Sequence, residues 1–318
     1  MEKTYKLKWL LFHSPVELFV RTATTFADEI SKLTNGRVEI EIWRLEDYQK
    51  EFLGGTDAPV EFFELLRNNN IQMSQIQTNH LGMNDATDFF AFDMPFLFDS
   101  HDHASRVLDG EIGDFLLDSL PEATKVRGLA FTYSGGYRCL ASKNPIRDAD
   151  SMSGSKIGVR ISPVHADLAT ALGAEANVSY DLIHETRLGD ENDLVQTTLP
   201  RFESQIDSSI HPYVINTRHN MFLTSIVIGE EVWKDLSDAD KDAFKKAAKH
   251  CAKLERQWSV DDAVNIENSA DEQQRLGIKE MIELTPEETQ KLKDRTAPLY
   301  EKYSAVFTEG LLDSIRKA

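Results

Sequence analysis

The sequence predicts an α/β fold, and two stretches of the chain support this prediction together with its length. Near the N-terminus, residues 5–12 predict a strand, residues 15–34 a helix and residues 38–42 a second strand. A strand–helix–strand unit is typical of a parallel sheet with a right-handed crossover. Residues 154–173 predict a strand, a turn and a helix. With 318 residues, the chain also exceeds the size at which one core usually divides into two domains.

The turn within residues 154–173 places an arginine at an edge of the sheet. Residues 156–161 are apolar at intervals and predict a strand, Ser162 is a good N-cap, and Pro163 suits the first helical position. Arg160 therefore ends a strand directly before a helix, where open α/β sheets bind ligands. Its guanidinium offers forked donors that fit a carboxylate. A surface or salt-bridged arginine explains the same pattern equally well.

Two further strand ends bring polar side chains to the same edge. His13 follows the first strand, and the helix that begins after Ser14 favours a negative charge at its N-terminus. Thr78 and Asn79, with His80 next to them, end a predicted strand. We expect Thr78, Asn79 and His80 to lie at the same edge as His13, because the carboxyl ends of parallel strands meet at one edge of a sheet.

The remaining elements follow from composition and spacing. Apolar residues at three- and four-residue intervals over residues 236–276 predict one helix of roughly 60 Å, long enough to cross two domains. In chain order we also expect a loop at residues 45–55, a helix at 57–67, a strand at 71–78, a buried segment at 90–98, a helix at 102–117, strands at 126–132, 174–180, 214–228 and 278–284, and a last helix capped by Thr285.

The composition opposes several classes of function. A net charge of -18 opposes binding to nucleic acid and to anionic membranes, because both need basic surfaces. No apolar run approaches ~18 residues, so we expect no direct insertion into a membrane. The N-terminus lacks the pattern of a signal peptide, so either the protein is cytoplasmic or a leader has been removed or lies outside this sequence.

Motifs for catalysis and metal binding are not found in the sequence. There is no Gly-x-Gly-x-x-Gly loop, no phosphate-binding loop and no Gly-x-Ser-x-Gly elbow, which disfavours an enzyme. Cys139 and Cys251 lie far apart without zinc-ligand spacing, and we expect buried free thiols rather than a disulfide. His101 and His103 fit solvated loop residues better than metal ligands. We expect no metal and no cofactor.

Several motifs resemble those of one transport family. Residues 154–160 form the pattern Gly-x-Lys-x-x-x-Arg, and Ser-Pro and then Ala-Leu-Gly-Ala follow within residues 162–174. Asp-Met-Pro-Phe-Leu-Phe occupies residues 93–98, and Arg-Val-Leu-Asp-Gly occupies residues 106–110. From about residue 5 to about residue 305, the chain resembles the solute-binding proteins of tripartite ATP-independent periplasmic (TRAP) transporters, including their dicarboxylate-binding members.

The resemblance implies a two-lobe periplasmic-binding-protein fold with hinge strands and a long bracing helix. The first lobe would hold residues 1–128 and 217–252, and the second residues 129–216 and 253–318, with the ligand cleft between them. Such proteins close on their ligands by a hinge motion. The resemblance further implies a periplasmic, monomeric receptor that binds a small organic acid, either a carboxylate or a sulfonate. It would deliver this ligand to the membrane permease subunits of a TRAP transporter.

The resemblance also implies a set of ligand-binding residues. Arg160 would clamp the ligand's carboxylate and Arg138 would assist, although a hinge salt bridge explains Arg138 nearly as well. Gln196 replaces the glutamate usual in the family and Thr197 the frequent asparagine, which points to a non-standard acid. The complete set is Arg160, Arg138, Thr197, Gln196, Tyr180, His219, Glu61, Thr78, Asn79 and His13. A core tyrosine, a structural histidine and a solvated carboxylate are the respective alternatives for Tyr180, His219 and Glu61.

Two other functions stay open at this point. The same fold serves equally well as a sensor that presents its ligand to a signalling receptor, and neighbouring permease or kinase genes would discriminate the two. An α/β enzyme that reuses the cleft, such as a small-molecule lyase or transferase, would reveal itself by turnover of the bound ligand. The resemblance itself implies binding without catalysis.

Overall fold

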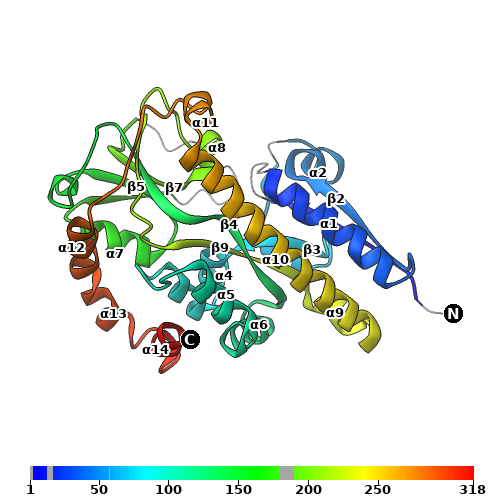
Figure 1. Cartoon of the computed structure of the whole chain (residues 1–318). Coiled ribbons are helices and arrows are strands. Elements are labelled where there is room, and N and C mark those ends of the chain that lie inside the picture. The colour runs from blue at the N-terminus through cyan, green and yellow to red at the C-terminus, as the bar shows by residue number, and fades with distance from the viewer. Residues whose placement is uncertain (1–2, 13–16, 57, 180–189) are drawn as a thin grey trace.

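The structure, a computed structural model, describes residues 3–12, 17–56, 58–179 and 190–318 and confirms the predicted α/β class. Figure 1 shows two lobes, with α10 (Asp238–Asn268) running diagonally across them. His13 and Tyr180 lie outside the described residues. In the described part of the chain, no helix combines the length and the apolar character that crossing a membrane requires.

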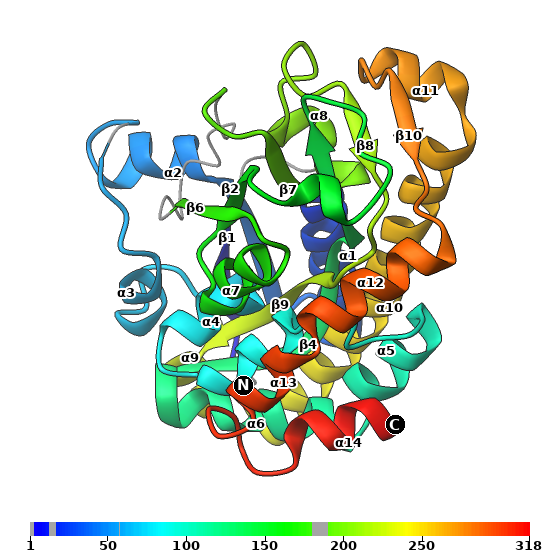
Figure 2. The same cartoon turned by 90° about the vertical axis from the view of Figure 1, so that its left-hand side faces the viewer.

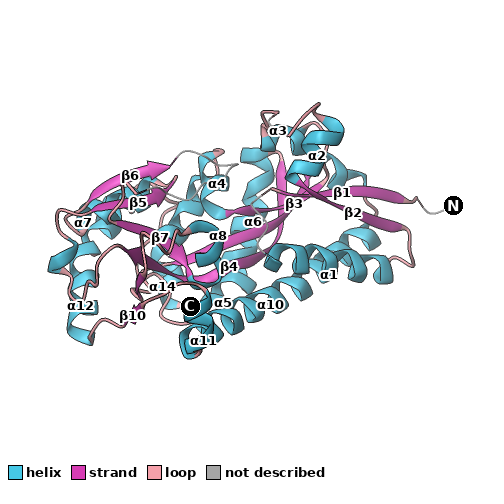
Figure 3. Cartoon of the chain, turned by 90° about the horizontal axis from the view of Figure 1, so that it is seen from above, coloured by secondary structure: helices cyan, strands magenta, loops and turns pink. Residues whose placement is uncertain are grey.

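One sheet runs through both lobes. Its described strands are β1 (Tyr5–Leu11), β2 (Val38–Arg44), β3 (Met73–Gln77), β4 (Val126–Ser142), β5 (Lys156–Arg160), β6 (Glu175–Ser179), β7 (Leu194–Thr198), β8 (Tyr213–Ile215), β9 (Met221–Gly229) and β10 (Glu280–Ile282). The order across the sheet is β2-β1-β3-β9-β4-β7-β5-β6, while β8 pairs with β4 and β10. We call the half with β1, β2, β3 and β9 the first lobe, and the half with β5, β6 and β7 the second lobe. Figure 3 shows these halves at opposite ends of the molecule.

Helices cover both halves of the sheet. They are α1 (Glu17–Leu33), α2 (Leu45–Phe52), α3 (Phe62–Arg67), α4 (Thr78–Met83), the 3₁₀ helix η1 (Thr87–Asp93), α5 (His101–Asp109), α6 (Glu111–Thr124), η2 (Asp150–Met152), α7 (Pro163–Ala171), η3 (Leu199–Arg201), α8 (Phe202–Gln205), α9 (Glu230–Asp235), α10, α11 (Ala270–Arg275), α12 (Pro286–Thr296), α13 (Pro298–Tyr303) and α14 (Leu311–Lys317).

β4 is the strand that joins the two lobes. Its first part pairs with β9 in antiparallel register, and its last part, Arg138 to Ser142, pairs with β7. The register shifts between Tyr133 and Gly136, where Gly135 and Gly136 have φ angles of 93° and 75°. The expectation of a strand that stops at residue 132 was therefore wrong. The glycines permit a bulge, and a bulge bends a strand without ending it.

The long helix braces both lobes, although it is shorter than predicted. Toward its N-terminus, Phe244 and Cys251 pack in a cluster with Trp9 and Phe26 of the first lobe. Toward its C-terminus, Ile266 packs with residues of β4 and β7. The 31 residues of α10 span about 46 Å. The single helix predicted for residues 236–276 ends at Ser269, whose extended backbone and side-chain cap start α11 instead.

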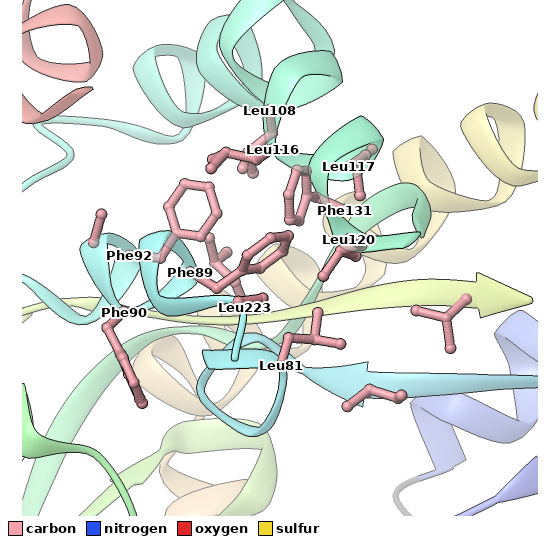
Figure 4. Packing of buried hydrophobic residues seen from close by; sticks show 14 of the residues in the cluster. Leu81, Phe89, Phe90, Phe92, Leu108, Leu116, Leu117, Leu120, Phe131 and Leu223 are labelled. Atoms are coloured by element: carbon pink, nitrogen blue, oxygen red, sulfur yellow. The ribbon is translucent and has the colours of Figure 1, made fainter. Parts of the chain in front are cut away.

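The segment at residues 90–98 is buried, as predicted, and lies at the centre of the main hydrophobic cluster. Phe89 and Phe92 of η1 pack against Phe131 of β4 with ring centroids 5.8 and 5.2 Å apart. Figure 4 shows these rings facing the leucines of α5 and α6. The 3₁₀ helix therefore anchors the chain directly before Asp93, whose role in the site is described below.

Several element boundaries differ from the prediction. Residues 45–52 form α2 rather than a loop, because Tyr48 and Phe52 stack one helical turn apart with a centroid distance of 4.8 Å. Among the described residues, the helix expected at 57–67 is shorter, because α3 begins only at Phe62. Gly110 divides the helix expected at 102–117 into α5 and α6. The strand expected at 214–228 is two strands, β8 and β9.

The C-terminal helices return to the first lobe. Figure 2 shows α12, α13 and α14 following one another down the molecule. Ile315 of α14 packs in the same cluster as Leu116 of α6. His103 is buried on α5, and its Nε2 donates to the carbonyl oxygen of Ile315 at 2.7 Å. His101 begins the same helix, so neither histidine is the solvated loop residue that we expected. The lobe boundaries given above from the sequence stay a prediction.

Candidate functional site

Arg160 lies where the sequence predicts it, at the last position of β5. Ser162 caps α7, with its hydroxyl accepting from the backbone N–H of His165, and Pro163 begins the helix. The side chain of Arg160 is only 7% exposed. β5 runs parallel to β7 with Gly158 opposite Val195, so the same register carried two residues further places Arg160 beside Thr197.

Arg138 enters the site from β4, just beyond the bulge. Its guanidinium carbon lies 3.8 Å from the centre of the Phe222 ring, which is a close cation–π contact. Its backbone N–H donates to the carbonyl oxygen of Asn220 at 2.8 Å. Arg138 stands opposite Thr198 in the pairing of β4 with β7. The strand that joins the lobes thus also carries a buried positive charge.

Gln196 and Thr197 face opposite sides of the sheet. Thr197 donates its hydroxyl to Oε1 of Gln205 at 2.9 Å. Gln196, one position earlier on β7, lies with its side-chain nitrogen 3.0 Å from Nε2 of His219. Neighbouring residues of a strand point to alternate faces, so the two predicted ligand residues do not share one face.

His219 is held as a neutral imidazole. Its Nδ1 lies 2.6 Å from the hydroxyl of Thr217, and its Nε2 contacts Gln196. Burial lowers its pKa well below the ordinary value, and the nearby charges of His165 and Arg138 act in the same direction. His219 therefore lies close to Arg138 but adds no positive charge of its own at neutral pH.

A buried carboxylate links the end of η1 to the start of α7. Ser162 donates its hydroxyl to Oδ2 of Asp93 at 2.7 Å, and Nε2 of His165 lies 3.3 Å from Oδ1. Burial opposes ionisation of Asp93, but His165, Arg138 and Ser162 outweigh it and hold the pKa below its ordinary value. Asn220 donates to the backbone carbonyl of Asp93 at 3.0 Å. This network fixes the turn that follows Arg160.

The structure adds a third arginine that the sequence did not single out. Arg201 of η3 has no exposed side-chain surface and donates to the hydroxyl of Ser134 at 2.8 Å. Its guanidinium carbon lies 5.1 Å from the ring centre of Phe222 and 6.0 Å from that of Phe19 on α1. Arg138 and Arg201 therefore share one aromatic ring, and Arg201 reaches the first lobe. An arginine directly after Pro200 resembles an ordinary turn residue, so no local signal marks it.

The first lobe contributes uncharged groups. Thr78 begins α4 rather than ending β3, and its hydroxyl donates to the carbonyl oxygen of Leu223 at 3.3 Å. Asn79 follows and is 2% exposed. Glu61 is exposed at the start of α3, so the structure does not bring its side chain into this buried set. His13 and Tyr180 fall outside the described residues.

The arrangement is suited to holding a small anion. Three buried arginines lie on β4, β5 and η3, and the buried side chains of Gln196, Thr197 and Thr198 lie on β7, between β4 and β5. No cluster of three or more metal-ligating side chains occurs in the part of the chain that the structure describes. Cys139 and Cys251 are buried free thiols, as predicted, and burial raises the pKa of each to about 12. Neither thiol is an activated nucleophile.

Comparison with known proteins places this chain in a family. The family described as "Bacterial extracellular solute-binding protein, family 7" (DctP) matches residues 12–179 and 196–305. The C4-dicarboxylate-binding protein DctB of Bacillus subtilis is 23% identical over 296 residues, covering 91% of this chain and 79% of that protein.

Solved structures match over almost the whole length. A TRAP periplasmic solute-binding protein from Polaromonas sp. JS666, bound to D-erythronate, is 26% identical with a TM-score of 0.80, covering 99% of this chain and 98% of that one. Another from Sulfurospirillum deleyianum, with bound succinate, is 22% identical with a TM-score of 0.81, covering 99% of each chain, and supports the fold alone. The two-lobe fold predicted from the sequence is confirmed, and the chain belongs to the family 7 bacterial extracellular solute-binding proteins, the binding subunits of TRAP transporters.

Proposed function

We propose that this protein is an extracytoplasmic receptor that binds a small organic acid between its lobes and delivers it to the permease subunits of a TRAP transporter. The observation that carries the proposal is that three arginines, Arg138, Arg160 and Arg201, are buried on segments that adjoin β7, namely β4, β5 and η3. Buried charge of one sign favours a ligand of the other sign. One relative is named as a C4-dicarboxylate-binding protein and another is bound to D-erythronate, which supports an organic acid as the ligand.

Arg160 is the residue to which we assign the ligand's carboxylate. It lies at the carboxyl end of β5 and directly before the N-terminus of α7, where backbone dipoles add to its positive potential. Asp93 and Ser162 hold the turn behind it. Arg138 and Arg201 then supply a second region of positive charge around Phe222. Binding favours the closed lobes because only that state brings both sides of the site against the ligand.

The receptor acts without catalysis, in the periplasm and as a monomer. The site contains a neutral histidine, and its buried carboxylate is already bonded to Ser162 and His165. Contact with the membrane is made through the permease subunits. Ion gradients rather than ATP then drive uptake.

A thermal-shift screen with organic acids followed by calorimetry tests the proposal. A ligand at 100 times its Kd stabilises a protein by about 2.7 kcal/mol, which is a clear shift. We expect Arg160→Ala to weaken binding of the best acid by at least about tenfold, because a charge-assisted hydrogen bond contributes about 1.5 to 3 kcal/mol. Arg147→Ala is the matched control, since Arg147 is exposed and pairs only at the surface with Glu280. Equal affinity in Arg160→Ala and parent protein contradicts the assignment.

A further inference from the structure

We propose that the ligand is a hydroxylated monocarboxylic acid and that Asn79 forms hydrogen bonds with one of its hydroxyl groups. This inference rests on the function proposed above and names the ligand class of the same site. It assigns the carboxylate to the second lobe and the hydroxylated end to the first.

The first observation is the state of the Asn79 side chain. Asn79 is 2% exposed, and both its Nδ2 and its Oδ1 are buried without a hydrogen-bond partner among the described residues. Leaving a buried polar atom without a partner costs about 1 to 3 kcal/mol, so native proteins rarely do so without a reason. The need for one donor and one acceptor is the same whichever way the amide group is turned. The partner of Asn79 must both donate and accept a hydrogen bond.

The second observation is where Asn79 lies. β3 pairs with β9, with Gln77 opposite Thr224, and the Thr78 hydroxyl donates to Leu223 on the same strand. The residue before Leu223 is Phe222, whose ring carries Arg138 at 3.8 Å. Asn79, the second residue of α4, therefore lies next to the residue that bonds to β9, the strand that carries Phe222.

The third observation is the distribution of charge across the two lobes. Among the described residues, four arginines are buried, and three of them belong to β4, β5 and η3 of the second lobe. The fourth, Arg256 of α10, donates hydrogen bonds to the carbonyl oxygen of Phe131 and to the carboxylate of Asp109. The buried first-lobe candidates among the described residues, Thr78 and Asn79, carry no charge. A second carboxylate at this end would meet no arginine from α4 and could not donate to Oδ1 of Asn79.

A hydroxyl group meets both requirements. It donates to Oδ1 and accepts from Nδ2, and it needs no countercharge. Gln196 extends the argument to the second lobe, because one of its two side-chain polar atoms contacts His219 and the other, Oε1, is buried without a partner among the described residues. Two amides with unmet hydrogen bonds therefore favour a ligand with more than one hydroxyl.

Calorimetry with four-carbon acids tests the inference. The probes are butyrate, 4-hydroxybutyrate, succinate and D-erythronate, which differ in hydroxyl content or in a second carboxylate. We expect the parent protein to bind D-erythronate at least about tenfold more tightly than either butyrate or succinate, with 4-hydroxybutyrate between D-erythronate and butyrate. A site built to bond a hydroxyl discriminates strongly against an analogue that lacks it.

Asn79→Leu keeps the branched shape of the side chain and removes both polar atoms. We expect it to weaken D-erythronate binding at least about tenfold while changing butyrate binding less than about twofold. Asn84→Leu is the matched control, because Asn84 caps the same helix and its side chain donates to the carbonyl oxygen of His80. If Asn79→Leu does not fold, the order of the affinities of the parent protein for the four acids tests the inference.

The outcomes separate this inference from the proposed function. Succinate or butyrate binding as tightly as D-erythronate, with binding lost in Arg160→Ala, overturns the hydroxyl inference and leaves the receptor function standing. Unchanged discrimination in a folded Asn79→Leu also overturns it. If no acid of a wider panel binds, the proposed function fails and this inference fails with it.

Discussion

The side-chain nitrogen of Gln196 lies 3.0 Å from Nε2 of His219, and this contact joins β7 to the segment between β8 and β9. Since the amide donates to Nε2, the imidazole proton resides on Nδ1 and is donated to the hydroxyl of Thr217. The pair is uncharged, although Arg138 lies close by. The pair therefore adds no charge of its own beside Arg138.

The first prediction concerns the charge of this pair. Gln196→Glu places a carboxylate against the imidazole, and a negative neighbour favours the protonated form. We expect the pKa of His219 to rise by about one unit or more relative to the parent protein, in which burial holds it well below its ordinary value. An NMR titration of the ring nitrogens measures the shift. Gln196→Leu, which adds no charge, is the control, and identical titrations in parent and Gln196→Glu would contradict the prediction.

The second prediction concerns the pH dependence of stability. Glu255 of α10 is fully buried and accepts from Nε2 of Gln75 at 2.7 Å. Burial raises its pKa to about 8, above the ordinary value of 4.5. The folded state therefore holds a proton that the unfolded state loses between these two values. The contribution of Glu255 to stability is complete below about pH 4.5, falls by about 1.4 kcal/mol per unit as pH rises, and is lost above about pH 8.

Urea unfolding of parent protein and Glu255→Gln between pH 5 and 9 isolates this contribution. The glutamine side chain resembles the protonated carboxyl group and does not titrate. We expect the free energy of unfolding of the parent to fall relative to that of the variant across this range. Parallel pH profiles would show that Glu255 titrates in the folded protein as it does in the unfolded chain.

The third prediction concerns the bulge in β4. A Cβ atom at Gly135 would lie inside van der Waals contact with Oγ1 of Thr198, and the backbone there has a φ of 93°. We expect Gly135→Ala to destabilise the protein by about 2 kcal/mol or more, because the clash adds to backbone strain. Gly154→Ala separates the two effects, since φ is 76° at Gly154 and nothing lies within 4 Å of an added Cβ. The control should cost only about 1 kcal/mol of strain. Equal losses in chemical unfolding would rule out the clash.

The strand–turn–helix at Arg160 was predictable because its signals are local. Ser162 and Pro163 specify the helix start wherever the chain places them, and the strand before them is apolar at regular intervals. The long helix was predictable for the same reason, except for its end. Ser269 breaks the helix by capping α11, and an apolar periodicity carries no information about such a break.

The rest of the site could not be predicted because it depends on tertiary contacts. Arg201 is buried only because Phe19 and Phe222 come from distant parts of the chain to meet it. Which face of the sheet Gln196 and Thr197 each take depends on the register of β7 with β4, which sequence motifs do not reveal. Residues 45–52 are mostly polar and therefore predicted a loop. The contact between Tyr48 and Phe52 explains why they form a helix.

The continuity of β4 has a mechanical consequence for the lobes. Since one strand belongs to both halves of the sheet, neither half rotates as a free body on a loop. Rotation requires torsion of the β4 backbone, and the glycines at the bulge are the positions where such torsion costs least. The backbone N–H of Gly135 donates to the Ser259 hydroxyl of α10 at 2.7 Å, so the helix resists the same torsion. Any change in the angle between the lobes therefore carries an elastic cost, which is shared by one strand and one helix.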